Sequence, residues 1–354
     1  MELLWFALAS GMVALYVVMD GFDFGAGALH LWVARSDRER RQVLAAIGPY
    51  WDGNEVWLIA TGGLLYVAFP KALGSALSGF YLAMMLVLWT LILRGLAIEF
   101  RGHLESPLWR QAGDVVFSAA STALVIVLGA AIGNLVRGMP IDRDGWFALT
   151  LFTDFGTSGE IGILDWYTVL VGVFTLAALS AHGAAYLAYK TSGPVQERAR
   201  RFGRPLAAAV AGLFAVVTVA TTFVTPGFLG AVPSRPAAWL AALVAAGGLV
   251  LLNLELRTGR DGRAFVGSTL FLGGLLAATA AAMYPVLLRA RNDPALSLTA
   301  PGTASAESSL RIALTWWSIA FPLAVAYFVV VWLLHRGKVQ AAADGEGYEE
   351  RTGS

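Results

Sequence analysis

Nine stretches of mostly apolar residues, each long enough to form a helix through a lipid bilayer, dominate this sequence. A helix needs about 20 such residues to cross the hydrocarbon core, and a helix can do so because its backbone groups bond one another. The sequence therefore predicts an all-α integral membrane protein with nine transmembrane helices. The predicted spans are residues 3–33, 52–69, 75–100, 114–136, 166–189, 205–225, 236–255, 264–288 and 310–334.

The composition agrees with this class and excludes several others. Of the 354 residues, 57% are hydrophobic and 14% are charged, and the mean hydropathy is +0.66. A soluble domain carries about 25% charged residues. The chain has no cysteine, which excludes a disulfide framework and thiolate metal centres. The net charge of +1 gives no indication of nucleic-acid binding.

Lys and Arg are divided unevenly between the two sets of connecting segments. Seventeen lie in segments 34–51, 101–113, 190–204 and 256–263 and after residue 334, seven lie in the other connections, and Arg94 lies inside a span. Because cytoplasmic segments are enriched in these residues, the N-terminus is predicted outside and the C-terminus in the cytoplasm. The longest outside connections, 137–165 and 289–309, are predicted to be irregular, and residues 339–354 to be a disordered cytoplasmic tail.

A weak similarity relates the ends of the first and fifth spans. GAGALHLWVARSDRERR begins at Gly25, and GAAYLAYKTSGPVQERARR begins at Gly183. In both, small residues are followed by aromatic and aliphatic residues and then by a Glu- and Arg-rich segment. This fits one transmembrane domain (1–338) made of two four-helix bundles, 1–136 and 166–288, with a peripheral helix at 310–334. A chance match between two membrane exits explains the similarity equally well.

Two acids lie inside the first span, in the segment MDGFDFGAG. Asp20 and Asp23 are three residues apart, which places both carboxylates on one helix face. Charged residues at the bilayer centre cost roughly 2.5–3.5 kcal/mol each, so they need a reason to be there. One interpretation is a pair that only hydrogen-bonds a neighbouring helix. The other is a protonatable or water-filled path.

A second polar group opens the second span, in GPYWDGNEVWLIATGG. Asp52 is placed near the N-cap with Glu55 three residues on, which is typical of a capped helix start, and Trp51 suits the membrane interface. Capping does not explain why Asn54 and Glu55 gather with Asp52 beside tryptophans. The alternative is a cluster that carries protons through carboxylates and bound water.

A third group, Arg94 and Glu99, lies in or at the end of the third span. Arg94 cannot lose its proton and needs an acceptor, unless its side chain extends to the interface. Its candidate partners are Asp20, Asp23, Asp52, Glu55 and Glu99. His182 is a single His inside a span, and a hydrogen bond within the core is favoured over heme ligation.

The segments MDGFDFGAG, GPYWDGNEVWLI and SGFYLAMMLVLWTLILRGLAIEFR together resemble subunit II of the cytochrome bd-type quinol oxidases. The resemblance is dense over residues 1–115 and thin afterwards, and the nine-helix layout with an external N-terminus agrees with it. It implies a subunit of a complex that oxidises quinol and reduces dioxygen to water. It also implies a multi-pass protein of the bacterial inner membrane.

The resemblance further implies roles for single residues. Asp23 and Asp52 match acids linked to proton delivery from the cytoplasm, and Asp20 matches the other acid of the first motif. Trp51 matches an aromatic residue beside that path, and Arg94 matches an arginine with a structural or pathway role.

Two positions depart from the family pattern. Glu99 stands where some members have Asp, so the acid is kept with a longer reach. Glu55 stands where some members have Gln, which adds a charge. Asn54 lies within the second motif as a supporting residue. No catalytic or metal-binding residue is expected in this subunit.

The resemblance implies heme b and heme d in a partner subunit I, quinol as the substrate, and contact with the bilayer and the quinone pool. It leaves room for a small single-helix accessory subunit and for a structural quinone, to which the sequence assigns no site. Two other functions stay open: an ion-coupled secondary transporter using Asp20 and Asp23, and a purely structural assembly subunit. A transporter should show broken helices at equivalent places in both halves, and the second half lacks an acid pair.

Overall fold

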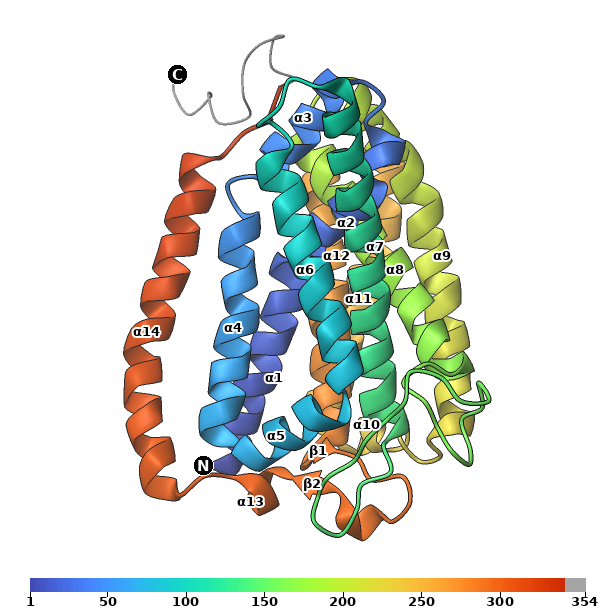
Figure 1. Cartoon of the computed structure of the whole chain (residues 1–354), viewed down its shortest axis with the longest axis vertical. Coiled ribbons are helices and arrows are strands. Elements are labelled where there is room, and N and C mark those ends of the chain that lie inside the picture. Colours follow the sequence, from blue (N-terminus) through green and yellow to red (C-terminus); the bar gives the residue numbers. More distant parts are fainter. Residues whose placement is uncertain (341–354) are drawn as a thin grey trace.

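The chain folds into an elongated bundle of long helices with short elements at both ends (Figure 1). The computed structural model describes residues 1–340, and the rest of the predicted tail lies outside the described residues. The helices are α1 (Glu2–Met19), α2 (Gly21–Val33), α3 (Asp37–Ile47), α4 (Trp51–Ala68), α5 (Pro70–Gly79), α6 (Tyr81–Phe100), α7 (Pro107–Arg137), α8 (Trp166–Lys190), α9 (Pro194–Val224), α10 (Ala231–Ser234), α11 (Pro236–Thr258), α12 (Asp261–Met283), α13 (Ala300–Thr303) and α14 (Glu307–Leu334). Strands β1 (Val286–Leu288) and β2 (Leu298–Thr299) pair antiparallel around a 3₁₀ turn, Pro294–Leu296.

Eight helical segments within the described residues are long and apolar enough to cross a membrane, which confirms the all-α membrane class. They coincide with eight of the nine predicted spans. The remaining one is α4, an 18-residue helix. It is less apolar because Asp52, Asn54 and Glu55 lie in its first two turns. The count of nine crossings stays a prediction.

Three predicted spans differ in detail from the structure. The first is interrupted at Asp20, which separates α1 from α2, and glycine at the next position is a poor helix former. The third is interrupted at Phe80, between α5 and α6. The eighth ends at Met283, because Pro285 has no N–H to continue a helix, and residues 286–288 form β1 instead.

The Arg-rich connections gather at one end of the bundle, as the sequence predicted for a shared side. α3 and the described C-terminal end lie at the top of Figure 1, and the N-terminus and the strands lie at the bottom. α3 was not predicted, and it begins with a capping box in which Ser36 and Glu39 bond each other's backbone N–H. The orientation relative to the cytoplasm stays a prediction.

The two segments of similar sequence pack directly against each other. A Cβ added to Gly25 on α2 would lie 1.9 Å from the Leu179 carbonyl oxygen on α8. One added to Gly183 on α8 would lie 2.3 Å from the Gly25 carbonyl carbon. Only glycine permits this approach of two backbones. The division into two four-helix halves stays a prediction.

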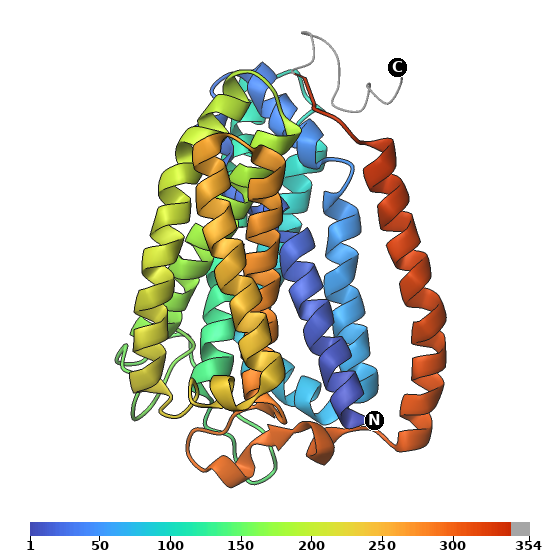
Figure 2. The ribbon, with the colours of Figure 1, turned by 180° about the vertical axis from the view of Figure 1, so that it is seen from behind.

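α14 stands apart from the bundle, and Figure 2 shows it separated from the antiparallel pair α11 and α12. Only Leu310 and Phe328 of α14 are buried. Its two ends are fixed by backbone bonds: Ser305 N–H to the Ala68 carbonyl (2.9 Å) and Val339 N–H to the Lys190 carbonyl (2.7 Å). Val339 falls in the predicted disordered tail, so the ordered chain continues past that boundary.

Candidate functional site

A buried ion-pair cluster forms where α1, α2, α4 and α6 meet. Arg94 of α6 is fully buried, and its Nη1 donates to Glu55 Oε1 at 2.6 Å. Its Nη2 donates to Asp20 Oδ1 at 3.3 Å. The Asp20 side chain is fully buried, whereas that of Glu55 is 25% exposed. The guanidinium therefore connects a carboxylate at the protein surface with one in the interior.

Asp23 is the second fully buried acid of this cluster. Its Oδ2 accepts a 2.7 Å hydrogen bond from Asn54 Nδ2, which also donates to the Met19 carbonyl at 2.9 Å. The interruption at Asp20 leaves the Met19 carbonyl available to Asn54. Asn54 thus ties the acid pair of the first span to the start of α4.

Aromatic rings enclose the guanidinium. The Arg94 Cζ lies 4.7 Å from the centre of the Phe24 ring and 5.8 Å from that of Trp51. Both distances suit cation–π attraction, which strengthens when the cation is shielded from water. The structure therefore brings together six of the eight residues that the sequence singled out: Asp20, Asp23, Trp51, Asn54, Glu55 and Arg94.

Asp52 and Glu99 are not part of the buried cluster. Both are exposed, and within residues 1–340 neither carboxylate makes a hydrogen bond or ion pair. The expected cap is also absent, because Tyr50 is the N-cap residue of α4 and makes no side-chain capping bond. Asp52 does interact electrostatically with Glu55, one turn further along the helix. Glu99, five residues after Arg94 on α6, makes no ion pair with it within the described residues.

Tyr16 is a cluster residue that the sequence interpretation missed. It precedes Asp20 by four residues, so the two side chains share one helix face, and they interact electrostatically. The Tyr16 hydroxyl is buried without a hydrogen-bond partner in the described residues. So are Asp20 Oδ2, Asp23 Oδ1, Asn54 Oδ1 and Arg94 Nε. Buried polar atoms are normally satisfied by protein or water, so this cluster has the capacity to bond water molecules.

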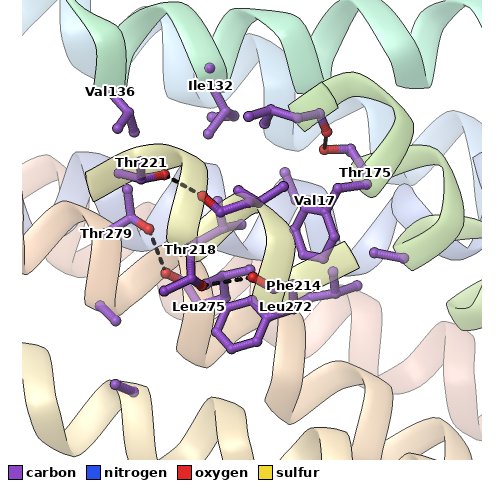
Figure 3. A pocket seen from close by; sticks show the side chains of 18 of the residues that line it. Val17, Ile132, Val136, Thr175, Phe214, Thr218, Thr221, Leu272, Leu275 and Thr279 are labelled. Atoms are coloured by element: carbon purple, nitrogen blue, oxygen red, sulfur yellow. Dashed lines mark hydrogen bonds between the residues drawn. The ribbon is translucent and has the colours of Figure 1, made fainter. Parts of the chain in front are cut away.

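An apolar cavity of about 380 Å³ lies beyond Tyr16 and Phe24, between α7, α8, α9 and α12. Figure 3 shows the threonines on its wall, and each hydroxyl bonds a carbonyl of its own helix. These threonines are Thr175, Thr218, Thr221 and Thr279. Tyr16 also lines this wall, but its hydroxyl is buried and interacts with Asp20.

All four histidines make hydrogen bonds within the described residues. His182 Nδ1 bonds Ser268 Oγ (2.7 Å) and its Nε2 bonds the Val18 carbonyl (3.0 Å), so both ring nitrogens are engaged. His30 Nε2 bonds Asp114 Oδ1 at 2.8 Å. His103 and His335 lie at the ends of α6 and α14. Within the described residues, no His, Asp and Glu side chains form a group that could hold a metal ion.

A second charge cluster, centred on Asp114 of α7, was also missed. The Asp114 carboxylate accepts from Arg101 Nε at 2.7 Å, from Arg40 Nη1 at 2.9 Å and from His30. Arg101 Nη2 also donates to Asp37 Oδ1 at 2.6 Å. This cluster joins α2, α3 and α7 at the Arg-rich end. A weak signal for this cluster was present in the sequence, because Asp114 is an acid at the very start of a predicted span.

Comparison with known proteins identifies the family. The profile described as cytochrome bd terminal oxidase subunit II matches residues 1–335. This chain belongs to that family. Cytochrome bd-I ubiquinol oxidase subunit 2 of Escherichia coli is 30% identical, over 92% of each chain. Cytochrome bd ubiquinol oxidase subunit 2 of Bacillus subtilis is 34% identical, over 57% of each chain.

The fold agrees with this membership. A chain of the bd oxidase structure from Geobacillus thermodenitrificans superposes with a TM-score of 0.70, covers 94% of this chain and 98% of its own, and is 17% identical. As a cytochrome bd oxidase subunit II, the chain is a multi-pass protein of the bacterial inner membrane and works beside a subunit I. The family resemblance predicted from the three motifs is confirmed.

Proposed function

We propose that this subunit delivers protons from the cytoplasm toward the oxygen-reducing centre of subunit I. The observation that carries the proposal is the double contact of Arg94, which joins Glu55, whose side chain is 25% exposed, to fully buried Asp20. The complex would oxidise quinol and reduce dioxygen to water at heme b and heme d of subunit I. Taking protons from one side only separates charge across the membrane without a pump.

We order the groups of the proposed proton route by their exposure to solvent, from the most exposed to the most buried. Asp52 is exposed and one turn from Glu55, so it would collect protons and pass them to Glu55. Glu55 adjoins Arg94 and Asp20, and Asn54 adjoins Asp23. Arg94 cannot release its proton, so it would hold the carboxylates in place and balance their charge while they and bound water transfer protons. Glu99 lies outside this order, and we assign it only to the surface near the entrance.

The transporter alternative finds less support. The first membrane segment is interrupted at Asp20, as transporter helices often are. Its counterpart α8 runs unbroken from Trp166 to Lys190 and has no acid in its span. The interruption therefore has no equivalent in the second half. The other alternative is a purely structural role, which the Asp52→Asn experiment below distinguishes from proton delivery.

The cavity fits a structural quinone, which the sequence left unplaced. Its wall is almost entirely apolar, which suits an isoprenoid tail. When bound there, a quinone would fill the bundle between α7, α8, α9 and α12. We place no step of proton delivery on it.

Asp52→Asn tests the proton role. The amide cannot take up and release a proton near neutral pH, while size and polarity are nearly kept. We expect the complex to assemble with normal heme spectra and to lose most of its quinol oxidase activity. Asp52→Glu should retain more activity than Asp52→Asn. Wild-type turnover in an assembled Asp52→Asn complex would remove Asp52 from the route.

A further inference from the structure

A second concave site lies on the outer face of the bundle and begins at Ala28, five residues after Asp23 on α2. It is a groove of about 430 Å³ between α2 and α7, and small residues, among them Ala28, Ala119 and Ala123, form much of its floor. Its two hydroxyl groups bond backbone carbonyls: Ser118 to Ala28 (3.4 Å) and Thr122 to Ser118 (2.8 Å). The groove therefore presents an apolar surface, and the small side chains of its floor keep it open.

Arginines gather where this groove reaches the Arg-rich end of the bundle. Trp32 lines the groove and is 63% exposed, and the exposed Arg35 follows it by three residues. Arg40 is held beside the groove by Asp114, the residue before groove-lining Val115. Tryptophan and arginine at the end of a membrane helix are typical of the lipid headgroup region.

Within the described residues, two carboxylates beside the groove are each shared by several cationic side chains. Asp114 is shared by Arg40, Arg101 and His30. Asp37 is shared by Arg41, Arg101 and Arg110. The Arg40 Nε is buried without a partner in the described residues. Exposed Arg35 and partly exposed Arg40 beside an apolar groove are complementary to a phosphate group attached to a hydrocarbon chain.

We propose that the α2–α7 groove binds one anionic phospholipid, with an acyl chain along Ala119 and Ala123 and the phosphate at Arg35 and Arg40. α7 and α14 lie on different sides of the bundle in Figure 1, so the site is separate from the isolated helix α14. Such a lipid would bridge α2 and α7. It would thereby stabilise the packing of α2, which also carries Asp23 of the buried cluster.

The test uses the complete complex, purified in detergent and depleted of lipid. Native mass spectrometry during titration with dioleoyl phosphatidylglycerol, and separately with dioleoyl phosphatidylcholine, measures the tightest lipid site. The wild-type complex should bind the anionic lipid more tightly. Ala123→Phe fills the groove and should abolish this site. Ala208→Phe, at an exposed alanine of α9 outside the groove, is the matched control and should bind as the wild type does.

A variant at the proposed phosphate site provides a second test in case the Ala123→Phe complex does not assemble. Arg35→Gln changes an exposed side chain and should weaken phosphatidylglycerol binding about fivefold, the effect of one arginine near a charged lipid. Arg260→Gln removes an exposed arginine at the same end but away from the groove, and should change nothing. Equal affinity for the two lipids in the wild type would overturn the proposal. Unchanged binding by Arg35→Gln, as would follow if a partner helix filled the groove, would overturn it too.

Discussion

At the scale of single residues, the sequence predicted which charges lie inside the membrane but not which of them meet. Asp20, Asp23 and Arg94 were expected to need partners because charges are rare in apolar spans, and in the structure Arg94 pairs with Asp20 while Asp23 bonds Asn54. The same reasoning from the sequence singled out Asp52 and Glu99, yet both are exposed. Their exposure depends on how far neighbouring helices extend, and helical spacing alone does not contain that information.

Arg94→Gln should strongly destabilise the complex. The substitution leaves Asp20 and Glu55 without their shared cation, and removing one partner of a buried ion pair costs about 3–5 kcal/mol. The stability of the Arg94→Lys complex should lie between those of the wild type and Arg94→Gln. Lysine keeps the charge but cannot bond both carboxylates in the same planar geometry. Thermal unfolding of the purified complex, followed by its heme absorbance, measures the order. A glutamine variant as stable as the wild type would show that the guanidinium does not hold the cluster together.

At the scale of elements, apolar length predicted the long helices, and local chemistry explains most departures. Pro285 ends the eighth span early and Ser36 starts an additional helix, both through features visible in the sequence. The interruption at Asp20 was not predicted. A helix with glycine at the next position can continue or break, and here the tertiary contact of Asn54 with the Met19 carbonyl accompanies the break.

Gly25→Ala should prevent normal packing of α2 on α8. The added Cβ would meet backbone atoms of α8, at Leu179 and Gly183, that cannot rotate away. Gly11→Ala is the matched control in the same predicted span, because nothing lies within 4 Å of the added Cβ. The yield of assembled complex by size-exclusion chromatography should fall sharply for Gly25→Ala and stay normal for Gly11→Ala. Equal yields would contradict the close approach of the two helices.

At the scale of the whole molecule, the uneven distribution of Lys and Arg agrees with the gathering of the Arg-rich connections at one end. It also predicts the orientation, so a reporter fused after Lys338 should be active only in its cytoplasmic form. A reporter that works only outside the cytoplasm provides the control at the same position. Activity of that second reporter would contradict an external N-terminus with nine spans.

The buried acids are proposed to move protons for the oxidase, and Asp23→Asn is the sharpest test of that role. Asparagine can still accept the hydrogen bond from Asn54 but cannot exchange a proton, so packing is kept and only the chemistry is lost. We measure oxygen uptake with quinol in a complex whose heme spectrum and subunit content match the wild type. Oxygen uptake should fall about tenfold or more, because losing a positioned acid or base has an effect of that size, and Asp23→Glu should restore part of it. Wild-type oxygen uptake by the assembled Asp23→Asn complex would contradict it and leave the cluster a purely structural role.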